Sequence, residues 1–393
     1  MSAHLMQRSD TVMATTYART PVVFTEGEGC QLRDAEGKTY WDFLAGIAVC
    51  NLGHAHPAVA NALASQARKL VHVSNLFYTE PQVALAEWLT SRSFGDRVFF
   101  ANSGAEANEA AIKLARKYFA EKGEPARYRI ITMEKSFHGR TMATLSATGQ
   151  EKVRIGFDPT LNGFDYVPFN NLDAVKAAIG PETCAIMVEP VQGEGGVRMA
   201  SPGYFQELRA LCDAAGILLI MDEIQTGMGR TGRLFAYEHT GVAPDIMTLA
   251  KALANGLPIG AMVARETVAA AFVPGSHGST FGGTPLICAG ALATVETLET
   301  EDLVRRSRET GAYFLAKLET LMADHPKVTA VRGIGLMLAM EFSESAGHLV
   351  DTCREAGFII NCIQDRILRF VPPLTIPEAA IDDLVACLDA ALA

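Results

Sequence analysis

The sequence predicts an α/β protein whose main body is a mostly parallel β-sheet with helices on both faces. Six short apolar runs have the length and branched composition of strands that are buried on both faces. They cover residues 97–101, 129–133, 184–189, 217–222, 245–249 and 259–263. Longer amphipathic stretches separate several of these runs, and alternating strands and helices are typical of parallel sheets.

The stretch after the first run shows why we expect a helix there. Ser103 and Glu106 form an S-x-x-E capping box, which is a signature of a helix start. Apolar residues then recur at helical spacing, at positions 107, 111, 114, 115 and 118. The pattern predicts a helix directly after the strand at residues 97–101.

The two chain ends have a different character. Residues 22–45 predict a small β meander, with a turn at the sequence DAEGK. A long helix pattern begins at about residue 286, and the later segments GIGLMLAMEF and LRFVPPL are interpreted as strands. We therefore expect a smaller α+β domain built from residues 1–56 and 286–393, and a large domain formed by residues 57–285.

Composition excludes several classes of protein. The chain has 393 residues, of which 49% are hydrophobic and 20% charged, which is ordinary for a folded globular protein and excludes a disordered one. The formal charge is −10 and no basic run occurs, so we expect neither a nucleic-acid nor an anionic-membrane partner.

Residues 267–295 carry no charged side chain, but glycines and prolines interrupt them, which favours a loop and ligand site over a membrane span. The N-terminus has no continuous apolar segment typical of a secretory signal. Eight cysteines are scattered without a C-x-x-C motif, which indicates buried thiols and a cytoplasmic location.

Five of the apolar runs lead directly into an unusual polar segment. These segments are residues 102–106, 134–140, 190–196, 223–227 and 250–251. Ligands bind beyond the carboxyl ends of the strands in open parallel sheets. Five such segments at one edge predict a binding site there.

Three features of that edge suggest a chemistry. Ser103, Gly104 and Ala105 offer free N–H groups at a helix start, which favours a phosphate, although an ordinary capped helix has the same pattern. Asp222 ends an apolar run and needs a partner, either a protonated heterocyclic nitrogen or, more simply, an internal arginine or a loop N–H. Lys251 also closes an apolar run and can be an amine nucleophile, or its head can simply reach water.

Other candidates are weaker alone. Arg140 and Arg369 lie in or beside apolar sequence and need carboxylate partners, either from a substrate or from internal salt bridges. The glycine-rich loop at residues 278–283 suits an anion. His54 and His56 could be read as a metal pair, but spacing provides no third ligand, so we expect no metal.

Together these segments resemble the class III, fold-type-I pyridoxal-phosphate aminotransferases. The likeness spans residues 17–373 and lies in ANSGAEANEAAIKLARK, SFHGRTMATLS, VEPVQGEGG, MDEIQTGMGRTG, LAKALANGLPIGA and HGSTFGGTPL. Within this family, TYARTPVVFTEGEGCQLRDAEGKTYWDFLAGIAVCNLGHAHP and HVSNLFYTEPQ are most similar to acetylornithine aminotransferases.

The resemblance implies a fold-type-I transferase fold and roles around pyridoxal 5'-phosphate. Lys251 would attach to the cofactor aldehyde and later move a proton, while Asp222 would keep the pyridine nitrogen protonated. Phe137 and Ile224 would pack against the ring faces, and Gln225 would bind the phenolic oxygen. The residues implied for the phosphate are Ser103, Gly104 and Ala105, joined by Thr280 from the neighbouring subunit of a homodimer with shared sites.

The resemblance also implies how substrates are selected. Arg140, with Ser279 and Tyr17 nearby, would bind the α-carboxylate of N2-acetylornithine. Arg369 would bind the α-carboxylate of glutamate, and Glu194 would form a switchable ion pair with it. The implied reaction moves the δ-amino group to 2-oxoglutarate, giving N-acetylglutamate 5-semialdehyde and glutamate in arginine biosynthesis.

Several alternatives remain open. Ornithine aminotransferases carry a tyrosine where Ile47 stands, which argues against free ornithine as the preferred donor. Succinylornithine, N-succinyl-diaminopimelate and 4-aminobutyrate are the other candidate donors. Two other classes are a metal-dependent hydrolase using His54 and His56, and a cofactor-binding protein without turnover. The two carboxylate-binding arginines argue against the latter.

Overall fold

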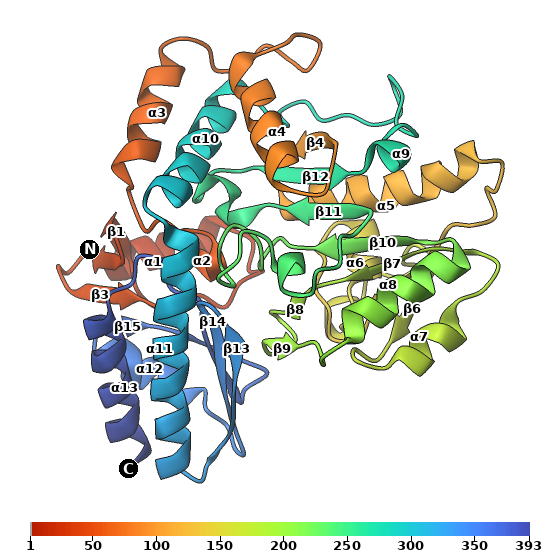
Figure 1. Cartoon of the computed structure of the whole chain (residues 1–393). Coiled ribbons are helices and arrows are strands. Elements are labelled where there is room, and N and C mark those ends of the chain that lie inside the picture. The colour runs from red at the N-terminus through yellow and green to blue at the C-terminus, as the bar shows by residue number, and fades with distance from the viewer. Residues whose placement is uncertain (1) are drawn as a thin grey trace.

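The computed structural model describes residues 2–393, and its centre is a seven-stranded sheet with the order β4-β12-β11-β10-β7-β5-β6 (Figure 1). The strands are β4 (Arg97–Ala101), β5 (Arg129–Met133), β6 (Phe164–Val167), β7 (Thr183–Val188), β10 (Leu218–Asp222), β11 (Ile246–Leu249) and β12 (Gly260–Ala264). Strand β12 is antiparallel to both of its neighbours, and the pairs from β11 to β6 are all parallel. The predicted mostly parallel sheet is therefore confirmed, with β6 as an addition.

Helices cover both faces of this sheet. Helix α5 (Gly104–Glu121) packs on one face beside α6 (Met142–Ala147) and α9 (Glu266–Ala269). Helix α8 (Tyr204–Ala215) covers the other, beside α7 (Leu172–Ala178). Adjacent strand residues divide between the two cores: Met187 packs with the α5 cluster and Ile186 with the α8 cluster. This two-sided burial explains why the strand sequences are apolar without alternation.

The start of α5 differs in one respect from the predicted capping box. The Ser103 hydroxyl accepts a hydrogen bond from the Glu106 N–H at 3.2 Å, as expected. The Glu106 carboxylate, however, reaches one residue further back and accepts from the backbone N–H of Asn102 at 2.6 Å. It accepts from the Asn102 amide as well, at 2.9 Å. The N–H of Asn102 therefore takes the place that the Ser103 N–H would have in a reciprocal box.

The N-terminal meander is confirmed as β1 (Phe24–Glu28), β2 (Gln31–Asp34) and β3 (Thr39–Asp42). The C-terminal part contains β13 (Val328–Ile334), β14 (Met337–Phe342), α12 (His348–Glu355), β15 (Phe358–Ile359), β16 (Asn361–Ile363), β17 (Ile367–Phe370) and α13 (Glu378–Leu392). Strand β15 pairs in parallel with β3, which joins the two chain ends in one sheet. The division at residues 56 and 285 stays a prediction.

Two strand interpretations need correction. The segment GIGLMLAMEF is a hairpin, because a turn at Gly335, which has a left-handed φ of 56°, separates β13 from β14. In LRFVPPL the strand ends at Phe370, since the following prolines cannot donate to a sheet ladder.

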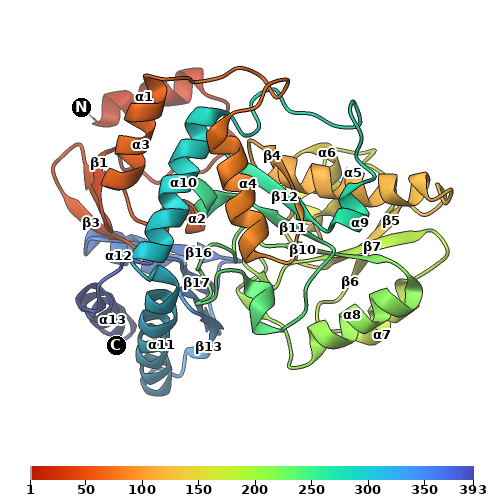
Figure 2. The ribbon, with the colours of Figure 1, turned by 45° about the horizontal axis from the view of Figure 1, so that its top comes forward.

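Further helices frame the molecule (Figure 2). They are α1 (Ser2–Val12), α2 (Ala45–Ala48), α3 (Pro57–Ala67), α4 (Glu80–Arg92), α10 (Pro285–Thr300) and α11 (Leu303–Asp324). Helix α10 packs against α3 and α4. Within residues 2–393, no helix has the length and apolar character needed to cross a membrane. The eight cysteines are free thiols, and Cys184, Cys212 and Cys288 are buried.

Candidate active site

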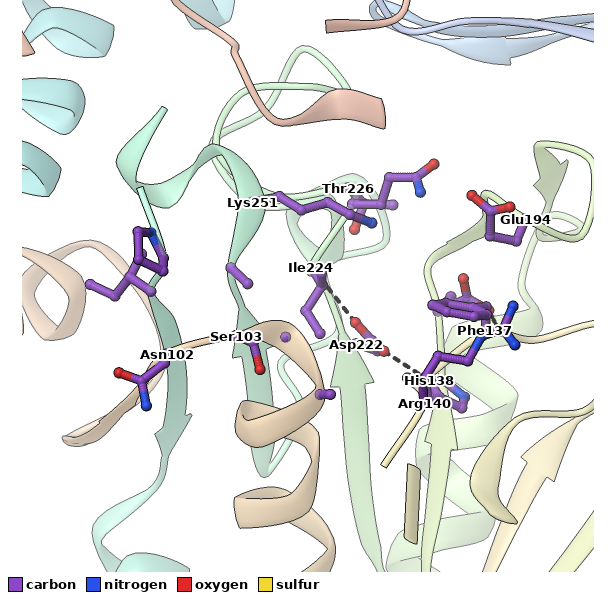
Figure 3. Close-up of a pocket in the computed structure, with 18 of the residues that line it drawn as sticks. Asn102, Ser103, Phe137, His138, Arg140, Glu194, Asp222, Ile224, Thr226 and Lys251 are labelled. Atoms are coloured by element: carbon purple, nitrogen blue, oxygen red, sulfur yellow. Dashed lines mark hydrogen bonds and ion pairs between the residues drawn. The ribbon is translucent and has the colours of Figure 1, made fainter. Parts of the chain in front are cut away.

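A cavity of about 350 Å³ opens at the carboxyl ends of the central strands (Figure 3). Its walls come from segments that follow β4, β5, β7, β10 and β11, which are far apart in the chain. Ten of the predicted site residues line it: Ser103, Gly104, Ala105, Phe137, Arg140, Glu194, Asp222, Ile224, Gln225 and Lys251. The packing of the parallel strands therefore brings the five polar segments together.

Asp222 ends β10 and is buried, with 4% of its surface exposed. Its Oδ2 accepts hydrogen bonds from Asn108 Nδ2 and His138 Nδ1, both at 2.8 Å, and its Oδ1 accepts from the Ile224 N–H at 3.0 Å. A carboxylate has about four acceptor positions, so these three donors leave one for a cation in the cavity.

Asn108 and His138 are site residues that sequence reasoning missed. Asn108 lies on the buried face of α5, and its amide oxygen accepts from Thr248 Oγ1 at 2.7 Å. Its amide nitrogen donates both to Asp222 and to the backbone carbonyl of His138, the latter at 2.7 Å. The available signal was a fully buried polar residue within an alanine-rich helix stripe, because such a side chain requires partners.

Lys251 follows β11 directly, and its side chain extends into the cavity (Figure 3). Its backbone φ of 45° is left-handed, a strained conformation for a non-glycine residue that is typical of functional sites. The side chain keeps some accessible surface because it faces the cavity, but protein surrounds it closely. This burial lowers the pKa of Lys251, although the charges of Glu194 and Asp222 oppose the shift.

Glu189 is a third missed residue. It lines the cavity, is 6% exposed, and accepts a hydrogen bond from the Phe137 N–H at 3.2 Å. Burial, followed by the nearby charge of Asp222, raises the pKa of Glu189 well above the ordinary value. This shift favours the neutral form of the carboxyl more than in an ordinary glutamate.

The start of α5 presents backbone N–H groups at one corner of the cavity. The first-turn N–H groups of Gly104 and Ala105 have no intrahelical acceptor and lie at the cavity wall. A Cβ at Gly104 would lie 2.9 Å from the Ile224 side chain, so glycine allows Ile224 to pack directly on this corner.

Two arginines lie at or near the cavity. Arg140 is exposed on the cavity wall, and its guanidinium lies 5.7 Å from the centre of the Phe137 ring. Arg369, on β17, is 1% exposed and places Nη1 at 2.5 Å from Glu194 Oε1. Burial raises the pKa of Glu194, but Arg369 outweighs it together with Lys251 and Gln225, so the pKa lies below its ordinary value.

Besides Arg369, three predicted residues lie outside the cavity wall. Ser279 Oγ accepts from the Asn102 amide at 3.1 Å and so lies one residue behind the wall. Thr280 and Tyr17 are exposed, Tyr17 with 75% of its surface. Their proposed roles therefore depend on a second subunit or a changed conformation.

The histidines considered for a metal bind carboxylates instead. His54 Nε2 lies 2.7 Å from Asp42 Oδ2, and His56 Nε2 lies 3.6 Å from Glu301 Oε1. Across residues 2–393, no group of three or more His, Cys, Asp or Glu side chains is arranged to hold a metal ion.

The cavity residues fit the expected cofactor on several grounds. Asp222 can accept from a protonated ring nitrogen, the α5 corner can bind a phosphate, and Lys251 is an amine with a lowered pKa. The Gln225 Oε1 atom is buried and has no partner in the described residues, so a ligand hydroxyl could satisfy it.

Comparison with known proteins identifies the family. The model of the family "Aminotransferase class-III" matches residues 12–392. An acetylornithine aminotransferase of Gloeobacter violaceus is 52% identical over 380 residues, covering 96% of this chain and 95% of that protein.

Solved structures agree with this assignment. The acetylornithine aminotransferase of Elizabethkingia anophelis has a TM-score of 0.89 at 34% identity, over 100% of this chain and 98% of that one. The ornithine aminotransferase of Toxoplasma gondii ME49 has a TM-score of 0.96 at 35% identity, over 100% of this chain and 95% of that one. The chain therefore belongs to the class III aminotransferases, enzymes that depend on pyridoxal phosphate.

Proposed function

We propose that this protein transfers the δ-amino group of N2-acetyl-L-ornithine to 2-oxoglutarate, as a step of arginine biosynthesis. The products are N-acetyl-L-glutamate 5-semialdehyde and L-glutamate. The observation that carries the proposal is the pair of arginines near one cavity. The guanidinium of Arg140 is accessible on the cavity wall, whereas that of Arg369 is paired with the carboxylate of Glu194. Full-length relatives named acetylornithine aminotransferase support the same substrate.

The two arginines serve different half-reactions in this proposal. Arg140 binds the α-carboxylate of acetylornithine, which places the distant δ-amine at the cofactor. Glu194 meanwhile occupies Arg369 and keeps the same carboxylate from binding there. When glutamate is the donor, Glu194 leaves and Arg369 binds the α-carboxylate in bidentate fashion.

The catalytic groups act on atoms at the centre of the cavity. When bound, pyridoxal phosphate supplies an aldehyde carbon and a ring that withdraws electrons. Lys251 would supply the amine for attachment. Once the amine of the substrate has displaced it, the freed Lys251 amine would remove a proton from the substrate carbon and return it at the neighbouring position. Asp222 holds a proton on the ring nitrogen, while Asn108 and His138 fix the orientation of its carboxylate.

An absorbance titration tests the proposed reaction. The purified protein is saturated with pyridoxal phosphate and then receives N2-acetylornithine. We expect the visible band of the lysine-bound cofactor to bleach and 2-oxoglutarate to restore it. Bleaching by ornithine, 4-aminobutyrate or a succinylated donor, but not by acetylornithine, would retain the family and reject the substrate.

The variant Arg140→Lys tests how the substrate is bound. Lysine keeps the charge and loses the forked geometry. We expect acetylornithine to lose more kcat/KM than glutamate. Equal losses for both donors would assign Arg140 a structural role.

We also infer a homodimer with shared sites, in which Thr280 of one subunit reaches the phosphate of the other. Thr280 is exposed and lies outside the cavity of its own subunit. The side chain of Asn75 holds the loop that carries Thr280, because it donates to the backbone carbonyls of Ser279 and Gly282 at 3.0 and 2.9 Å. This region exposes large apolar side chains, namely Leu76, Phe77, Tyr78 and Phe281 at 84%, 65%, 98% and 62%. Such a contiguous apolar surface is typical of a subunit interface.

Sedimentation measurements on wild-type protein and on Tyr78→Asp test the dimer. We expect a dimer that dissociates in the variant and loses activity with it. A monomeric wild type with full activity would reject shared sites. A cytoplasmic location completes the proposal, since the free cysteines would stay reduced there.

A further inference from the structure

Gly193 lies in the loop between β8 (Val191–Gln192) and β9 (Arg198–Met199), next to Glu194. Its backbone φ is not left-handed, so the conformation alone does not require glycine. The two glycines that follow Glu194 are each constrained in another way. Gly196 has a φ of 108°, and a Cβ on Gly195 would lie 2.9 Å from the backbone oxygen of Lys135.

The space beside Gly193 is filled by one side chain. A Cβ on Gly193 would lie 2.1 Å from Gln225 Oε1, 2.6 Å from its Cδ and 2.9 Å from its Nε2. These are the three nearest atoms, and all belong to the amide of Gln225. The amide therefore occupies the space beside the loop that any larger residue at position 193 would fill.

Gln225 connects two parts of the site from this position. It lines the cavity, and its side chain helps to lower the pKa of Glu194, the carboxylate that pairs with Arg369. Its Oε1 is buried and has no partner among residues 2–393. A displaced amide would thus change both the contact proposed with the cofactor and the surroundings of the Glu194 carboxylate.

We propose that Gly193 is a positioning residue, which leaves the space for the Gln225 amide and so sets where that amide meets the cofactor's phenolic oxygen. This inference rests on the cofactor-binding role proposed for Gln225. The loop between β8 and β9 would then influence the electronic state of the cofactor through Gln225, in addition to carrying Glu194. The clash at Gly193→Ala involves only the end of a flexible side chain, so the variant should fold with a shifted amide.

A double-mutant cycle tests the proposal with Gly193→Ala, Gln225→Ala and the combined variant. The first readouts need no substrate: the visible spectrum of the bound cofactor and its dissociation constant. We expect Gly193→Ala to shift the band and to lower kcat/KM by about ten-fold or more, as displacement of a site group does. In the Gln225→Ala background, Gly193→Ala should have no further effect.

The control is Gly180→Ala, because a Cβ there would meet nothing within 4 Å and Gly180 is exposed. An equal effect of Gly193→Ala in both backgrounds, or no effect at all, would overturn the proposal. If Gly193→Ala alone fails to fold, folding of the double variant supports it and failure of both overturns it. If the wild-type protein binds the cofactor but does not use acetylornithine, only the proposed substrate is rejected. The double-mutant cycle followed by the cofactor spectrum would still test the role of Gly193.

Discussion

Asn108 Nδ2 lies 2.8 Å from Asp222 Oδ2 in the interior of the protein, which ties the first turns of α5 to the end of β10. The same amide group accepts from Thr248 Oγ1, on β11, at 2.7 Å. Three elements of the large sheet region thus meet at the carboxylate that faces the cavity. In the role proposed for Asp222 at the cofactor ring, its partners matter as much as the carboxylate itself.

Asn108→Ala should weaken cofactor binding. A buried hydrogen bond to a charged group contributes about 1.5–3 kcal/mol, so we expect a dissociation constant about ten-fold higher or more. Equilibrium titration of apoprotein with pyridoxal phosphate measures it. The control is Asn162→Ala, an exposed asparagine whose backbone carbonyl, but not its side chain, binds Arg116. The same affinity in both variants would contradict the orienting role.

Glu194→Gln should change the choice between the two donors. Without the carboxylate, Arg369 is free, so glutamate should bind more tightly and acetylornithine should bind there unproductively. We expect the ratio of the two kcat/KM values to shift toward glutamate by about ten-fold, since charged hydrogen bonds contribute about 1.5–3 kcal/mol. Stopped-flow half-reactions measure each donor separately. Glu207→Gln, on the exposed side of α8, is the control, and unchanged half-reaction rates would reject the switch.

Lys251→Ala should abolish the visible band of the attached cofactor, whereas the exposed Lys152→Ala should retain it. Because burial lowers the pKa of Lys251, its amine is neutral at lower pH than that of an ordinary lysine. The rate of cofactor attachment should therefore reach its plateau at a pH below the usual lysine range. A rate that still rises through the range of free lysine would contradict the lowered pKa.

The raised pKa of His54 leads us to expect that the stability of the protein depends on pH. Hydrogen bonds to Asp42 and then to Cys50 raise the pKa of His54 to about 9 from the ordinary 6.5. A group whose pKa is raised by folding stabilises the folded state fully at pH values below its pKa in the unfolded chain. For His54 this contribution to the free energy of unfolding is lost as the pH rises through about 9. We expect a loss of at most about 3 kcal/mol in the free energy of unfolding.

Urea unfolding between pH 6 and 9.5 measures this loss in wild type and in His54→Gln, which can still donate to Asp42 but does not titrate. The variant should lose less stability over that range. His4→Gln, exposed on α1, is the control and should behave as wild type does. Parallel curves for wild type and His54→Gln would contradict the assignment.

The pair of His54 and Asp42 also holds an unusual turn. Asp42 Oδ1 accepts from the N–H groups of Leu44 and Ala45, both at 2.8 Å, and Ala45, Ile47 and Ala48 all have left-handed φ values of 50°, 68° and 59°. Such residues are strained in this conformation, so the buried carboxylate offsets part of the cost. The sequence alone contained no sign of this turn.

The sequence by itself determined the elements and the edge at which the site lies. Apolar runs of strand length identified six strands of the large sheet, and helical periodicity after Ser103 identified α5. These are local properties: a period and a burial requirement are present within a few consecutive residues. For the same reason, the local pattern was enough to locate the polar residues at the strand ends.

Only the tertiary structure decided which side chains meet. Asn108 and Asp222 are 114 positions apart, and Glu194 and Arg369 are 175 apart. The fit of Gly193 against Gln225 likewise depends on how one loop packs on the end of β10. Contacts of this kind depend on strand order and on close packing between elements, and no local pattern encodes them.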